Sequence, residues 1–136
     1  MFEVFEHTAD LGLRIRAGDL PTLMAEAGRA LFSVIVADLG KVELRQRVTL
    51  HVSFDEHPLL LQDWLSELLF LFESRQLVLT DFQVSIADGE LTATVAGEEL
   101  NPARHQLQNE VKAITYHGLL VEQVDGGWLA EVILDI

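Results

Sequence analysis

Apolar and polar residues alternate along several segments of the chain, as they do in half-buried β-strands. This pattern predicts strands at residues 2–5, 11–15, 42–52, 82–86, 91–95, 111–117, 119–124 and 128–136. Asp88 and Gly89, which separate two of these segments, form a dipeptide typical of two-residue hairpin turns. The chain is therefore expected to form a largely antiparallel sheet.

Two other segments repeat their apolar residues every three or four positions, which is the spacing of an amphipathic helix. The first helix is predicted to begin after Asp19, a residue suited to capping a helix N-terminus, and to end near residues 38–40. The second is predicted to follow Pro58. Its apolar side is expected to pack in the core rather than line a ligand pocket, and it consists of Trp64, Leu65, Leu68 and Phe72.

The order of these elements is strand, strand, helix, strand, helix, hairpin and three strands. It predicts an α+β fold built as a two-layer sandwich, in which two amphipathic helices cover one face of the sheet. A doubly wound parallel sheet would need more crossover helices. No linker or internal repeat interrupts the chain, so residues 1–136 are predicted to form a single domain.

Composition excludes several classes of protein. The chain has 136 residues and no cysteine, so it has no disulfide scaffold, zinc finger or thiol nucleophile. Its 9 Lys and Arg against 22 Asp and Glu give a net charge of −13, which repels phosphates and argues against direct nucleic-acid binding. We find neither an apolar run long enough to span a membrane nor a signal peptide, so a cytoplasmic location is expected.

The usual signatures of nucleotide-binding, hydrolase and metalloprotease sites are missing from the sequence. Residues 6–10 (EHTAD) nevertheless place two acids, an imidazole and a hydroxyl beside a strand end. Asp10 could ligate a cation there with His7 as its neighbour. The alternative is a capped turn that contains a half-buried histidine.

The last two residues place the side chain of Asp135 next to the main-chain carboxylate of Ile136. These two anionic groups could share a divalent cation with another acid. The alternative is an aspartate that faces solvent at a strand edge. The sequence alone leaves both interpretations open.

Lys112 is one of two lysines in the chain, and alternation places it on the same strand face as Ile114 and Tyr116. It could contact a partner or an anion, or it could simply be a solvated lysine. The loop at residues 101–105 leaves a similar choice, because Arg104 and His105 could bind a ligand. Alternatively, Arg104 could pair with Glu98 or Glu99.

Four segments together resemble the archease family: EHTADLG at 6–12, PARH at 102–105, VKAITYH at 111–117 and the terminal Asp-Ile pair. The segment WLSELLFLF at 64–72 also matches the family pattern, and the resemblance covers the whole chain. It implies an accessory protein rather than a catalyst. Archeases activate the GTP-dependent RtcB-type ligase that joins RNA ends in tRNA splicing, by promoting guanylylation and multiple turnover of the ligase and broadening its nucleotide use.

The resemblance also implies a functional site. The family's metal site corresponds to Asp10, Asp135 and the terminal carboxylate of Ile136, with calcium as the expected ion. Lys112 corresponds to the family's functional lysine, and His7 and His117 are candidates to support the metal ligands. Carboxylate oxygens suit a hard cation such as Ca²⁺.

Two alternative functions remain at this point. One is a small metal-dependent hydrolase that uses Asp10 and Asp135, with His7 or His117 as general base. The other is an acidic chaperone or scaffold for RNA-processing proteins. Substrate turnover by the isolated protein would favour the first alternative, and activity retained after substitution of Asp10 would favour the second.

Overall fold

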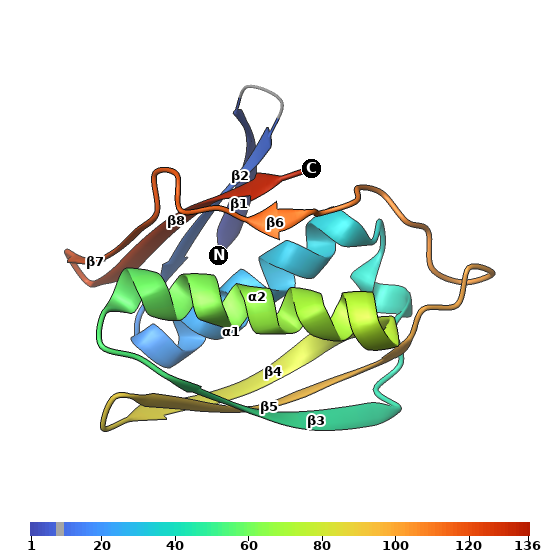
Figure 1. The fold of residues 1–136 in the computed structure, drawn as a ribbon, viewed down its shortest axis with the longest axis horizontal. Coiled ribbons are helices and arrows are strands. Elements are labelled where there is room, and N and C mark those ends of the chain that lie inside the picture. The colour runs from blue at the N-terminus through green and yellow to red at the C-terminus, as the bar shows by residue number, and fades with distance from the viewer. Residues whose placement is uncertain (8–9) are drawn as a thin grey trace.

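The computed structural model describes residues 1–7 and 10–136, which fold into three layers with two helices between two antiparallel sheets (Figure 1). The elements follow along the chain in the order β1 (Phe2–His7), β2 (Asp10–Ala17), α1 (Leu20–Ile35), the 3₁₀ turn η1 (Leu39–Lys41), β3 (Gln46–Ser53), α2 (His57–Arg75), β4 (Leu77–Ala87), β5 (Glu90–Glu99), β6 (Ala113–Ile114), β7 (Leu120–Val124) and β8 (Gly127–Asp135). No helix of the described residues is long and apolar enough to cross a membrane.

The five-stranded sheet has the order β1-β2-β8-β6, and β7 also pairs with β8. The three-stranded sheet has the order β3-β5-β4. The predicted α+β class, the antiparallel pairing and the two helices are confirmed. The predicted two-layer arrangement is wrong, because the strands form two sheets and the helices lie between them (Figure 1).

The burial of α1 on two sides explains why the fold has three layers rather than two. Ten of its sixteen residues are buried, because one side contacts β4 and the other contacts β2. The helix begins as predicted, since the Asp19 side chain accepts a hydrogen bond of 2.8 Å from the Thr22 backbone N–H. This hydrogen bond lowers the pKa of Asp19.

The strand predictions fail mainly at 111–117, where the structure has only β6 (Ala113–Ile114). Ile114 is buried while Lys112 and Tyr116 are exposed, so the three side chains do not share one face as predicted. Residues 42–45 precede β3 rather than extending it. The hairpin at Asp88 and Gly89 is confirmed, and both residues have the positive φ that this turn requires.

Trp64 lies at the centre of the core with its side chain fully buried. Its indole N–H donates a 2.8 Å hydrogen bond to the Met24 carbonyl oxygen, which ties α2 to α1. Its ring also packs edge-on against Phe82 of β4. The prediction that the Trp64 side of the helix is core is therefore confirmed.

We expect Trp64→Phe to lower the free energy of unfolding by about 2 kcal/mol, because it leaves a small cavity and removes the indole hydrogen bond that ties α2 to α1. Urea unfolding followed by circular dichroism measures this change. The matched control is Phe70→Leu on the exposed side of the same helix, with an expected change within about 0.5 kcal/mol. Equal effects of the two substitutions would contradict a core role for Trp64.

Candidate functional site

Strand ends from distant parts of the chain lie side by side in the five-stranded sheet. Asp10, the first residue of β2, is directly opposite Asp135, the last residue of β8. His7 of β1 is opposite Asp10, and Ala113 of β6 is opposite Asp135. The antiparallel register therefore brings residues from the β1–β2 hairpin, from β8 and from β6 into one row.

The Asp10 and Asp135 side chains lie on the same face of the sheet, because residues directly opposite in an antiparallel pair point the same way. Their Cβ atoms are expected to lie about 5 Å apart, and like charges at this spacing destabilise a sheet. The neighbouring pair, Leu11 and Leu134, packs towards the core, so the two carboxylates face away from the helices. Both aspartates are partly exposed.

These donors fit a hard divalent cation. Two carboxylates face each other, and the terminal carboxylate follows one residue after Asp135. Among the side chains that the structure describes, no group of three or more Asp, Glu or His residues could hold a metal ion. A cation bound by Asp10 and Asp135 would therefore need main-chain or water oxygens to complete its coordination.

Lys112 is held beside this row by its backbone. Its N–H donates a 2.7 Å hydrogen bond to the Asp135 carbonyl oxygen, while the side chain is exposed. From the other side, the Gln62 amide of α2 donates a 3.2 Å hydrogen bond to the Ile114 carbonyl. The segment that carries Lys112 is thus fixed between β8 and α2.

The structure describes the two candidate histidines, His7 and His117, to different extents. The backbone of His7 lies in β1 opposite Asp10, but its side chain, like Thr8 and Ala9, lies outside the described residues. His117 is exposed three residues beyond β6, and its backbone N–H donates a 3.2 Å hydrogen bond to the Thr115 hydroxyl. A supporting role for either ring at the carboxylates remains a prediction.

The sheet surface next to the carboxylates is packed around Phe5. Its ring lies across Gly12, where a Cβ atom would come within 2.1 Å of the ring. The Arg14 guanidinium lies 4.8 Å from the centre of the same ring. Arg14 donates a 3.1 Å hydrogen bond to Glu131, which raises the pKa of Arg14. Gly12 of the EHTADLG motif therefore leaves room for the Phe5 ring beside the carboxylates, and a larger residue there would displace this ring.

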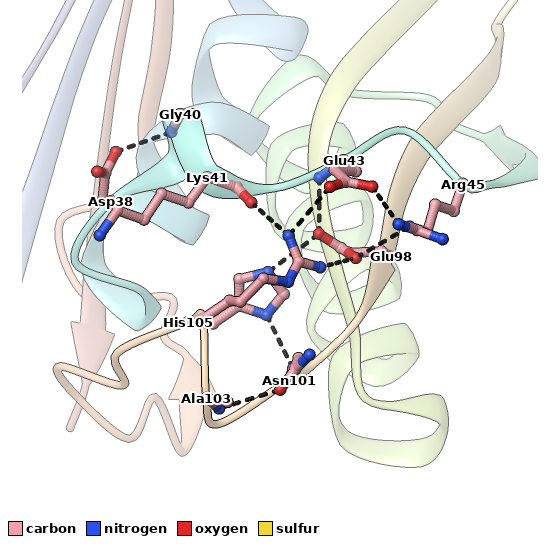
Figure 2. A network of polar contacts seen from close by, with 10 residues as sticks. Asp38, Gly40, Lys41, Glu43, Arg45, Glu98, Asn101, Ala103 and His105 are labelled. Carbon is pink, nitrogen blue, oxygen red and sulfur yellow. Dashed lines mark hydrogen bonds and ion pairs between the residues drawn. The ribbon is translucent and has the colours of Figure 1, made fainter.

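A second polar cluster forms where the 101–105 loop meets β5 (Figure 2). Glu98 is only 4% exposed, and its carboxylate accepts hydrogen bonds from the Glu43 backbone N–H at 2.7 Å and from His105 at 3.1 Å. Arg104 also pairs with Glu98, which confirms the structural interpretation of this arginine.

His105 is fully satisfied within this cluster. Its Nδ1 accepts a 2.8 Å hydrogen bond from the Asn101 backbone N–H, so the ring proton must lie on Nε2, which donates to Glu98. His105 is therefore a neutral, buried histidine that fastens the loop, rather than a ligand-binding residue. The sequence indicates Glu98 only as one of two possible partners for Arg104. Nothing in the sequence around Glu98 predicts that its side chain is buried.

Fold and site define a small acidic α+β protein in which a carboxylate at the start of β2 faces a carboxylate at the end of β8. Comparison with known proteins identifies the group more closely. The model of the archease protein family matches residues 2–136, and the chain belongs to this family. The resemblance predicted from the sequence motifs is thus confirmed.

Individual relatives agree over their whole length. The chain is 37% identical to protein archease of Methanopyrus kandleri, over 99% of each chain. It is 39% identical to protein archease of Pyrococcus abyssi, over 99% of this chain and 98% of the relative.

Two solved structures have the same fold. The solution structure of protein 1598 from Methanobacterium thermoautotrophicum matches with a TM-score of 0.86 and 35% identity, over 99% of this chain and 98% of that one. The crystal structure of a Thermotoga maritima protein, described as an archease and possible chaperone, matches with a TM-score of 0.67. It covers 100% of this chain and 98% of its own, and its 20% identity supports the shared fold alone.

Proposed function

We propose that this protein activates a GTP-dependent RtcB-type RNA ligase of tRNA splicing. It promotes guanylylation of the ligase and multiple turnover, and it broadens the nucleotides that the ligase accepts. The observation that carries this proposal is the direct pairing of Asp10 with Asp135 in the β2–β8 register, next to the backbone of Lys112. Membership of the archease family supports it.

The paired carboxylates suit a divalent cation, and we propose calcium. Asp10, Asp135 and the terminal carboxylate of Ile136 would hold it. When bound, the cation supplies a positive charge that offsets the repulsion between the carboxylates and can attract a phosphate oxygen. The protein fixes the spacing of the two aspartates through the backbone register, so the site needs little rearrangement to bind.

The net charge of −13 fits a protein partner rather than RNA. An RNA ligase must present a basic surface to its substrate, and an acidic protein is attracted to such a surface over a distance of several ångströms. Docking there would bring Asp10, Asp135 and Lys112 to the part of the ligase that handles phosphates. We propose that the cytoplasm is where the two proteins meet.

The decisive experiment measures multiple-turnover ligation by the cognate ligase with and without substoichiometric amounts of this protein. Guanylylation of the ligase is followed in the same reactions. We expect both to rise. If neither changes with the correct nucleotide present, the proposal fails. Substrate hydrolysis by the isolated protein would instead favour a metal-dependent hydrolase.

We expect Lys112→Gln to lower the stimulated rate about tenfold while leaving calcium affinity unchanged, because Lys112 bonds Asp135 through its backbone N–H, which the substitution keeps. Ligation assays and calcium titration calorimetry measure the two effects separately. The control is Lys41→Gln, which removes the same charge from η1. Equal rates for the two variants would exclude a specific role for Lys112.

A further inference from the structure

Within the described part of the chain, helix α2 has one side with exposed side chains. In Figure 1 this helix crosses the front of the molecule between the two sheets, with α1 behind it. Its buried side includes Leu61, Trp64 and Leu68. Two large apolar residues point the other way, because the Leu59 side chain is 43% exposed and the Phe70 side chain is 62% exposed. The exposed side is therefore not purely polar.

Leu59 and Phe70 belong to one continuous stripe. They are eleven residues apart, which corresponds to three helical turns and about 16 Å along the axis. Asp63 and Ser66 lie between them on the same side. We name this stripe of Leu59, Asp63, Ser66 and Phe70 the α2 face. An exposed phenylalanine on a rigid helix can anchor a partner with little loss of conformational entropy.

The charges around the α2 face have one sign. Asp63, Glu67 and Glu73 are exposed on or beside it, and among the described residues no Lys or Arg forms an ion pair with them. Near Leu59 the surface deepens into a cavity of about 510 Å³, whose lining also includes Asp63, Asp88 and Glu90. A surface that fits here must carry basic side chains around an apolar contact.

We propose that the α2 face is a docking surface for a basic region of the ligase, with Phe70 as its apolar anchor and Asp63 and Glu67 as its charged contacts. This inference rests on the proposed function, because it takes the ligase as the partner. The Gln62 side chain donates a hydrogen bond to the Ile114 carbonyl oxygen of β6, two residues from Lys112. The α2 face therefore adjoins the segment that carries this lysine. The α2 face supplies affinity, and the Asp10–Asp135 pair supplies activation.

A second copy of this chain is a poorer occupant. If two copies met through their α2 faces, the acidic side chains of one copy would lie opposite those of the other. Each whole molecule also carries a net charge of −13. Like-charge contacts across an interface are strongly unfavourable. A basic protein surface instead neutralises these carboxylates while it covers Phe70.

The test separates docking from activation by titrating this protein into the ligation assay. We expect Phe70→Ala to raise the concentration required for half-maximal stimulation by roughly tenfold, with the same rate at saturation and the same calcium affinity. Glu67→Lys should act in the same direction. The matched controls are Leu107→Ala, an exposed apolar residue in the 101–109 loop, and Glu122→Lys on β7. Both should behave like the wild type.

Three results would overturn the inference. One is a Phe70→Ala titration identical to that of Leu107→Ala while the wild type still stimulates, which leaves the proposed function intact. Another is a Phe70→Ala variant that lowers the ligation rate at saturation but leaves the concentration for half-maximal stimulation unchanged. The third is a wild-type dimer that Phe70→Ala dissociates in sedimentation experiments without any change in ligase stimulation. A wild-type protein that neither binds nor stimulates the ligase would reject both proposals.

Discussion

Asp10→Asn is expected to abolish stimulation of the ligase and to weaken calcium binding by roughly two orders of magnitude. The substitution keeps the size of the side chain but removes one of the two carboxylates that face each other across β2 and β8. Asp135→Asn should have the same effect from the opposite strand. Multiple-turnover ligation and calcium titration calorimetry measure the two losses.

The same substitution should not harm the fold. Without calcium, Asp10→Asn is expected to be at least as stable as the wild type, with a gain of up to about 0.5 kcal/mol, because it removes a like-charge pair. Calcium should raise the Tm of the wild type and leave that of the variant unchanged, since only the wild type binds it tightly.

Asp125→Asn is the matched control, because it removes a carboxylate from the turn before β8, at the other end of that strand. It should retain stimulation and calcium binding. If Asp10→Asn unfolds the protein instead, the carboxylate has a structural role. If stimulation survives in a folded variant, a scaffold that acts through its acidic surface becomes the better interpretation.

The elements that the sequence predicts well are those whose signals are local. The hairpin at Asp88 and Gly89 depends on two residues that accept positive φ, and the α1 start depends on one capping side chain. The division into two sheets is not local. Alternation in β3 and in β8 looks similar along the chain, and only long-range packing against opposite sides of α1 and α2 separates the sheets.

The candidate site shows the same limit. The motifs identify Asp10, Asp135 and Lys112, but their spacing along the chain says nothing about their distance in space. The β2–β8 register pairs the two aspartates. The predicted alternation around Lys112 fails because only Ala113–Ile114 form a strand, so its position depends on a backbone hydrogen bond to Asp135.

Glu98→Ala is expected to lower the free energy of unfolding by about 3 kcal/mol at pH 7. The loss is large because the Glu98 carboxylate is the common acceptor for the Glu43 backbone N–H, His105 and Arg104 (Figure 2). Removing it leaves His105 Nε2 buried without an acceptor. Glu99→Ala, at the exposed neighbouring position, should change stability by less than about 0.5 kcal/mol.

The contribution of Glu98 should also depend on pH. Burial raises the pKa of Glu98, but hydrogen bonds from Glu43, Arg104 and His105 outweigh burial and hold the pKa below its ordinary value of 4.5. A carboxylate whose pKa is lower in the folded state stabilises the fold above its unfolded pKa and loses this contribution as the pH falls through its folded pKa.

The stability difference between the wild type and Glu98→Ala should therefore be constant above about pH 5.5 and shrink below about pH 4.5. Urea unfolding between pH 7 and pH 3 measures it, and a difference that does not change over this range would show that the charge of Glu98 contributes nothing. Calcium affinity should be the same in both proteins at pH 7, because Asp10 and Asp135 belong to β2 and β8 rather than to the loop that Glu98 fastens.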